Sequence, residues 1–227
     1  MPWWAVAVAV VVLALVVVDI RLDGPLDHVD HRLAARTGSW DLRNRPAARW
    51  PLTVGVWFGQ RAVVLVGGAL IAIGLTWRSR TCEPLLRFVV AVLGVAAVVY
   101  GFKFAMARNA PSQDALGVPV GQGASFPSGH LANAILMWGL ADWSVRTWAT
   151  PWWLRRAVRA GRWIAPFAVF TAMMLLNYHW LSDFVGGAAV GVILLGVALW
   201  PRWAQVAGWL DAHRPATTTS RPGSRAS

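Results

Sequence analysis

Seven ionisable residues lie within or beside the apolar runs of this chain: Arg61, Lys103, Arg108, His130, Asp142, His179 and Asp183. Asp142 is expected to pair with Arg146, four residues later on the same helix. Lys103, Arg108, His130, His179 and Asp183 are the first candidates for chemistry. Ionisable groups in hydrocarbon are costly, so they are candidates for function wherever they occur. Two histidines, a carboxylate and two cations at one membrane face would form an anion site with acid–base or nucleophilic chemistry. Any one of them alone would be interpreted as a polar group at headgroup level, but the set of five favours a site.

The sequence FPSGH at residues 126–130 stands directly before an apolar run and predicts the start of a helix. A helix N-terminus next to a glycine offers free backbone N–H groups and a positive dipole end to a phosphate. Ser128 is suited to the N-cap position and adds a hydroxyl. His130 then lies in the first turn and faces the same anion.

His179 and Asp183 are four residues apart. This spacing lets the carboxylate accept a hydrogen bond from one imidazole nitrogen. Such a bond fixes the tautomer and leaves the other nitrogen free to act as a nucleophile.

The composition indicates that these residues are positioned by membrane helices. The chain has 227 residues, of which 57% are hydrophobic and 14% charged, and its mean hydropathy is +0.50. Soluble domains carry about 25% charged residues, and disordered chains combine low hydrophobicity with high charge. A span needs about 17–25 apolar residues. Six runs approach that length and predict an all-α polytopic bundle: Trp3–Ile20, Leu52–Trp77, Leu86–Met106, Leu131–Trp148, Trp163–Leu176 and Phe184–Trp200.

The net charge of +11 sets the expected orientation. Arginines are concentrated at residues 78–87, at residues 146–162 and after residue 200. With six spans all three regions lie on one side, which the positive-inside rule makes cytoplasmic. Both termini are then cytoplasmic, and the five candidate residues lie at the extracytoplasmic face. Because the basic residues fall between apolar runs, we expect contacts with membrane lipids and no nucleic-acid partner.

We expect residues 1–214 to form a single membrane domain and residues 215–227 a disordered cytoplasmic tail. Residues 20–50 are polar and predict a short amphipathic helix at His28–Thr37, either lying at the headgroups or acting as a lid. His28 and His31 lack further ligand groups, so no metal site is expected. Cys82 is the single cysteine, which excludes a disulfide framework.

Three motifs resemble those of the type 2 phosphatidic acid phosphatase (PAP2) superfamily of membrane lipid phosphatases. The family signatures are Lys-x6-Arg-Pro, Pro-Ser-Gly-His and Ser-Arg-x5-His-x3-Asp. The second is complete at Pro127–His130, the third retains His179 and Asp183, and the first retains Lys103 and Pro111. The resemblance spans about residues 55–200. It implies a six-helix bundle whose catalytic core is shared with haloperoxidases.

The resemblance also implies roles for these residues. His179 would attack phosphorus and form a phosphohistidine, and Asp183 would orient it. His130 would protonate the leaving oxygen and then activate water. Lys103, Ser128 and the Gly129 backbone would hold the phosphoryl oxygens, so that neither a metal nor another cofactor is needed.

Two positions depart from the family pattern. Ala110 stands where the first signature has arginine, and Met173 where the third has it. Loss of a charged partner in a desolvated anion site costs about 2–5 kcal/mol. Arg108 is a candidate phosphate-binding replacement for the first arginine, and Arg61 is a candidate for the second. Arg61 could instead pair with a neighbouring helix.

These observations predict a metal-independent phosphatase in a bacterial cytoplasmic membrane. Its substrate would be a lipid phosphate or diphosphate, such as a polyprenyl diphosphate, phosphatidylglycerol phosphate or phosphatidic acid. Two alternatives stay open: a non-catalytic relative that binds a lipid or a partner protein, and a phosphotransferase with a lipid or glycan acceptor. The sequence leaves open whether the chain forms a homo-oligomer.

Overall fold

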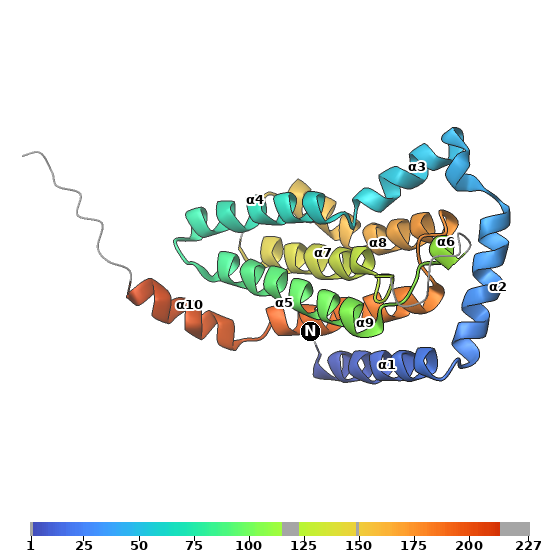
Figure 1. Ribbon diagram of the computed structural model, residues 1–227. Helices are drawn as coiled ribbons and strands as arrows, with labels where there is room; N and C mark the ends of the chain where they lie inside the picture. Colours follow the sequence, from blue (N-terminus) through green and yellow to red (C-terminus); the bar gives the residue numbers. More distant parts are fainter. Residues whose placement is uncertain (1, 115–122, 149, 214–227) are drawn as a thin grey trace, which may run out of the picture.

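The computed structural model describes residues 2–114, 123–148 and 150–213, and within them all regular secondary structure is helical. The helices are numbered in chain order (Figure 1). They are α1 (Trp3–Arg21), α2 (Pro25–Ser39), the 3₁₀ helix η1 (Leu42–Asn44), α3 (Pro46–Trp57), α4 (Arg61–Ser79), α5 (Glu83–Met106), α6 (Pro111–Asp114), α7 (Gly129–Thr147), α8 (Trp152–Leu175), α9 (Leu181–Ala198) and α10 (Arg202–Ala212).

Helices α7 and α9 form the centre of the bundle. Helix α7 packs against α8, α9, α4 and α5, and α9 also packs against α1 and α5. Most residues of α7 and α9 are buried, whereas α1 buries only Ala9 and Val16. The N-terminal turns of these two central helices carry His130 and Asp183, so part of the candidate site is built on the most buried helices of the fold.

Two glycines allow α9 to approach α7 closely. A Cβ atom on Gly187 would lie 2.5 Å from the Ser128 carbonyl oxygen, and one on Gly191 would lie 2.9 Å from Ile135 Cβ. Larger residues at either position would push the helices apart. The Gly-x3-Gly spacing therefore serves packing within one chain.

The described residues contain four stretches that are long and apolar enough to cross a membrane: Trp3–Arg21, Pro46–Ser79, Glu83–Gln113 and Leu181–Ala198. The protein is a multi-pass membrane protein. Helices α7 and α8 have the length of spans but are less apolar, because α7 carries buried polar residues and the first half of α8 carries four arginines. The count of six spans stays a prediction.

Three features of the helices differ from the sequence-based expectation. The predicted run Leu52–Trp77 is divided between α3 and α4, and Gly59 in the break approaches the carbonyl oxygen of His130 so closely that a Cβ atom would lie 2.3 Å from it. Helix α8 begins at Trp152 rather than Trp163, since arginine favours helix although it lowers hydropathy. Helix α10 was not predicted. The predicted disordered tail lies outside the described residues.

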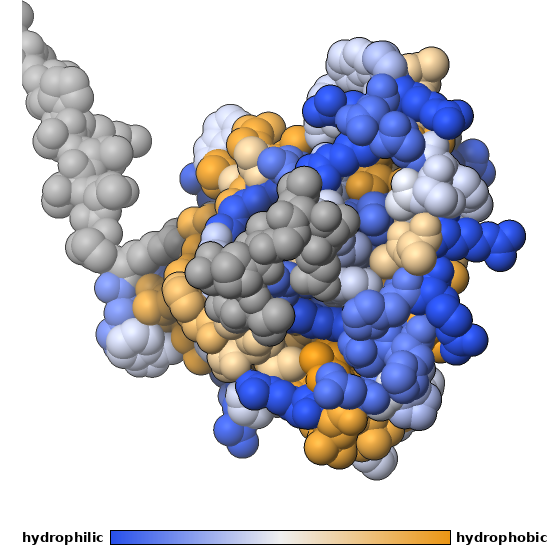
Figure 2. Space-filling model, turned by 45° about the vertical axis from the view of Figure 1, so that its right-hand side comes forward, coloured by the Kyte–Doolittle hydropathy of each residue, from blue (hydrophilic) through white to orange (hydrophobic). Residues whose placement is uncertain are grey.

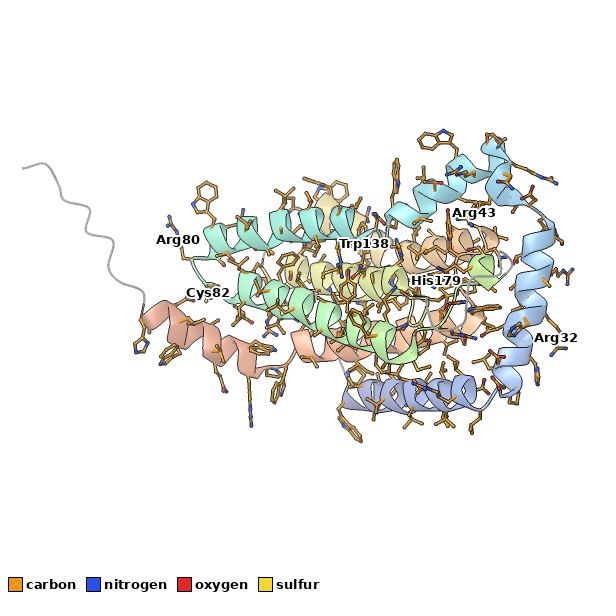
Figure 3. The ribbon with its side chains drawn as sticks, in the orientation of Figure 1. Arg32, Arg43, Arg80, Cys82, Trp138 and His179 are labelled. Atoms are coloured by element: carbon orange, nitrogen blue, oxygen red, sulfur yellow. The ribbon has the colours of Figure 1, made fainter. Side chains whose placement is uncertain are left out.

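The two ends of the bundle differ in what they carry. The α4–α5 connection and α10 lie at one end, and α2 and α6 lie at the other, where α2 runs across the ends of the bundle helices (Figure 1). Hydrophilic residues gather on that second end (Figure 2). Arg80 and Cys82 mark the first end, and Arg32 and His179 lie toward the second (Figure 3).

Candidate active site

His179 is positioned by the way in which α8 ends. Asn177 has a φ of 56°, in the left-handed region that asparagine tolerates. The Tyr178 amide donates to the Met173 carbonyl (3.0 Å) and the Asn177 amide to the Met174 carbonyl (3.1 Å). These two bonds form a Schellman motif, which satisfies the last carbonyls of the helix and reverses the chain. His179 therefore lies in a tightly held turn between α8 and α9.

Asp183 lies in the first turn of α9 and is fully buried. Its Oδ2 lies 3.1 Å from His179 Nδ1 and accepts a hydrogen bond from the Trp180 amide at 3.1 Å. The hydroxyl of Ser125 donates to the same oxygen and also lies 3.2 Å from His179 Nδ1. The contact expected from the spacing of four is present. A proton held on Nδ1 by Asp183 leaves Nε2 as the nucleophilic nitrogen.

The N-terminus of α7 lies beside this pair. Ser128 occupies the N-cap position, and its amide donates to the backbone carbonyl of Asp183 at 2.9 Å. Its hydroxyl is buried and has no hydrogen-bond partner among the residues that the structure describes. The first amides of α7, beginning with Gly129, have no carbonyl within the helix to bond. Free donors at a helix N-terminus are suited to bind the oxygens of an anion such as phosphate.

Two further candidate residues, His130 and Lys103, lie at this end of the bundle. His130 lies in the first turn of α7, and its Nε2 is 2.8 Å from Gln60 Oε1 in the break before α4. The Lys103 ammonium, near the end of α5, donates to the Ala124 carbonyl and lies within electrostatic range of Asp183. The structure therefore brings His130 and Lys103 to the end of the bundle that holds His179. Gln60 is a contact partner of His130 that the motifs do not indicate.

Arg108 reaches the site but is bonded to protein carboxylates. It follows Ala107, whose φ of 45° ends α5 in the left-handed region. Its Nη1 donates to Asp183 Oδ1 at 3.1 Å, and Nη2 donates to Asp27 and Asp30 at 2.8 and 3.0 Å. Nη1 also donates to the Ser182 hydroxyl. Both terminal nitrogens of Arg108 thus already have carboxylate partners. The expectation that Arg108 binds phosphate stays a prediction.

Four residues at the site carry no role that the motifs predict: Asp27, Asp30, Ser125 and Ser182. Asp30 on α2 is 1% exposed, and it accepts hydrogen bonds from the amide of Ser182 at 3.0 Å and from its hydroxyl. In the sequence, the signal that could have indicated Asp27 and Asp30 is their i, i+3 spacing beside the predicted helix His28–Thr37. This contact joins α2 to α9, and α2 also packs against α8.

Ala110 and Met173 are the two positions that depart from the family pattern, and their surroundings differ. Met173 is buried in an apolar cluster with Val169 and Phe184. The amide of Ala110 donates to Gln113 Oε1 at 2.8 Å. Arg61 stacks over Tyr100 and donates to its hydroxyl at 2.7 Å, so it pairs with the neighbouring helix α5.

Asp142 and His31 make further polar contacts. Asp142 pairs with Arg146 at 2.9 Å, as the i, i+4 spacing suggests, and also with Arg162 at 2.8 Å. His31 contacts Asp27 at 3.3 Å. No group of three or more potential metal ligands occurs in the part of the chain that the structure describes.

Comparison with known proteins identifies the family. The model of the PAP2 superfamily matches residues 84–207, more than half of the chain. The chain belongs to the PAP2 superfamily. A search of curated proteins gave no match. Among solved structures, the chain is similar to a transmembrane PAP2-type phosphatidylglycerolphosphate phosphatase from Bacillus subtilis, with a TM-score of 0.66 and 17% identity over 92% of this chain and 98% of that one.

PAP2 membership supports a phosphatase-type enzyme that acts on a lipid phosphate, and the structural likeness shows a PAP2 membrane phosphatase fold. The matched region includes Lys103, His130, His179 and Asp183. Helix α2, with Asp27 and Asp30, lies before it.

Proposed function

We propose that this PAP2 protein hydrolyses a lipid phosphate or diphosphate through a phosphohistidine intermediate. The observation that carries the proposal is the buried His179–Asp183 pair beside the N-terminus of α7, where the Ser128 hydroxyl has no partner among the described residues. A nucleophile with a fixed tautomer next to an array of donors is the combination that phosphoryl transfer needs.

The residues divide the chemistry into two steps. In the first, His179 Nε2 forms a bond to phosphorus while the bond from phosphorus to the leaving oxygen breaks, and His130 donates a proton to that oxygen. In the second, His130 takes a proton from water, whose oxygen attacks phosphorus and releases His179. Lys103, the Ser128 hydroxyl and the Gly129 amide would hold the phosphoryl oxygens. Their charge and dipoles stabilise the transition state without a step that needs a metal.

The substrate class is a lipid that carries a terminal phosphate: a polyprenyl diphosphate, phosphatidylglycerol phosphate or phosphatidic acid. Phosphatidylglycerol phosphate has support from the structural neighbour, which is named for it. A membrane location for the site suits all three, because the lipid chain stays in the bilayer while the phosphate reaches the polar end of the bundle.

Phosphate release tests the proposal. Purified protein in detergent, without added metal, would be assayed with a polyprenyl diphosphate, a polyprenyl phosphate, phosphatidic acid and phosphatidylglycerol phosphate, beside a His179→Ala control. Release that disappears in the control supports the proposal and ranks the lipids. Acid-labile labelling of the wild type by a ³²P-labelled lipid, absent in the control, would support the covalent intermediate. No release from any lipid by folded protein would overturn it.

We also propose that the site faces the extracytoplasmic side of a bacterial cytoplasmic membrane, with both termini in the cytoplasm. The support is the arginine distribution and the separation of the two ends in Figure 3. Single cysteines test this in a Cys82→Ser background. A membrane-impermeant maleimide should label Arg32→Cys in intact cells but Arg80→Cys only after permeabilisation. The reverse pattern would overturn the orientation.

A second candidate is a non-catalytic lipid-binding or partner-binding protein. It is favoured by Ala110 and Met173, and by the bonding of Arg108 to carboxylates, since together these leave Lys103 as the predicted cationic phosphate ligand. Such a protein would bind a lipid phosphate without release or labelling. A phosphotransferase would instead be labelled at His179 and turn over only when an acceptor is added.

A further inference from the structure

One guanidinium group connects three carboxylates from two parts of the chain. Arg108 bonds Asp183 through Nη1, and it bonds Asp27 and Asp30 through Nη2. Its side chain is 11% exposed, and its guanidinium lies 5.2 Å from the centroid of the Trp180 ring. Charge-assisted hydrogen bonds in such a screened position are short and strong. The cluster is therefore held firmly and is closed to bulk water on several sides.

Asp30 makes a second connection, to the start of α9. Its Oδ1 accepts from the Ser182 amide, and its Oδ2 accepts from the Ser182 hydroxyl as well as from Arg108. A carboxylate at a helix N-terminus is favoured by the free amides and the helix dipole. Asp30, which lies on α2, thus caps the first turn of α9 at Ser182, the residue before Asp183.

These contacts divide the Asp183 carboxylate between two sets of partners. Oδ2 faces His179, Ser125 and the Trp180 amide, whereas Oδ1 faces Arg108. The orientation of the carboxylate toward His179 consequently depends on where Arg108 is held. Arg108 is held in turn by Asp27 and Asp30.

We propose that Asp30, assisted by Asp27, is a positioning residue for the catalytic pair, and that α2 is part of the active site. Asp30 acts through Arg108 and Ser182 to fix the Asp183 carboxylate against His179 Nδ1. This inference builds on the proposed phosphatase function and changes the role expected for Arg108, which positions Asp183 instead of binding phosphate.

The test compares Asp30→Asn with a matched control on the same helix. Arg32→Gln is suited to that purpose, because Arg32 is exposed on α2 and its Nε donates to the His28 carbonyl of the same helix. Hydrolysis of phosphatidylglycerol phosphate in detergent micelles gives kcat and KM. We expect Asp30→Asn to lower kcat about 10- to 100-fold with KM within about twofold, since small displacements of catalytic groups have effects of this size. Arg32→Gln should keep wild-type kinetics.

Arg108→Gln separates positioning from phosphate binding. We expect it to lower kcat like Asp30→Asn, and the double variant to lose little more than the worse single variant because the two residues act as one unit. A rise in KM at unchanged kcat would assign Arg108 to phosphate binding and overturn the proposal. Additive losses in the double variant, or equal loss in Arg32→Gln, would also overturn it.

A second readout does not depend on activity. In ¹⁵N-histidine NMR spectra, the His179 signals are those missing from His179→Ala. We expect the wild type to show the Nδ1-protonated tautomer and Asp30→Asn a mixture of both. A tautomer unchanged in folded Asp30→Asn would overturn the positioning role. If the wild type released no phosphate, the proposed function would fail, while the tautomer would still decide this inference.

Discussion

Two buried aspartates lie toward opposite ends of the bundle, and their surroundings differ. Asp142, toward the end of α7, is 1% exposed and pairs with Arg146 and Arg162, which are about two-fifths exposed. Asp183, at the start of α9, is fully buried and shares Arg108 with Asp27 and Asp30. One end provides two guanidinium groups for a single carboxylate. The other provides a single guanidinium group for three.

This difference separates a structural ion pair from a site. Asp142 has two guanidinium partners, both of which reach solvent, and its contacts join α7 to α8. The cluster around Asp183 has more carboxylates than guanidinium groups, and Lys103 is a further cation within electrostatic range of Asp183. Burial, an imbalance of charge and a histidine in contact are features of functional sites. Asp142 is buried, but its partners among the described residues include no histidine.

The largest effect is expected for His179→Ala. Without the nucleophile, release of phosphate from the best lipid should fall by at least about 10³-fold. The protein should stay folded, because Asp183 loses one buried partner but keeps Ser125, the Trp180 amide and Arg108. The assay is phosphate release, with a thermal melt as the control for folding. Substantial remaining activity would assign the nucleophile elsewhere.

The second largest loss of activity is expected for Asp183→Asn. The amide retains the shape of the carboxylate but favours the wrong tautomer of His179, and the corresponding change in a catalytic triad costs about 10⁴-fold in kcat. We expect a loss of about 10³- to 10⁴-fold, measured as kcat in detergent. A loss under tenfold would mean that Ser125 alone orients His179.

Lys103→Met should have an intermediate effect. Removal of a cation from a desolvated anion site costs about 2–5 kcal/mol, or on the order of 30- to several-thousand-fold in kcat/KM. Arg61→Met is the matched control, because Arg61 is bonded to Tyr100 and is expected to change kcat/KM by less than about threefold. A larger loss for Arg61 than for Lys103 would assign the phosphate-binding cation to α4.

Asp142→Asn should have the smallest effect on activity. Hydrolysis should stay within about twofold of the wild type, while the free energy of unfolding falls by about 1–2 kcal/mol, since Arg146 and Arg162 lose a buried partner but reach solvent. Thermal unfolding in detergent measures the second quantity. A loss of activity at wild-type stability would break the contrast between the two aspartates.

Short spacings in the sequence predicted the local geometry of the site correctly. The His179–Asp183 and Asp142–Arg146 contacts each join residues four positions apart, and Ser128 occupies the predicted N-cap. Such contacts lie within one helical turn or one adjoining turn, so the residue types and their separation are sufficient to predict them. The roles of these residues in catalysis stay proposals.

Residue types and their spacing were sufficient to predict the class of the protein: a helical membrane protein of the PAP2 superfamily whose polar residues gather at one end. The contacts of Asp30 with Arg108 and Ser182, across separations of 78 and 152 residues, arise from the packing of the helices. The same packing places Met173 in an apolar cluster and breaks the predicted second run near Gly59. Hydropathy and spacing describe single segments. Contacts between distant segments depend on how the helices pack, which no single segment encodes.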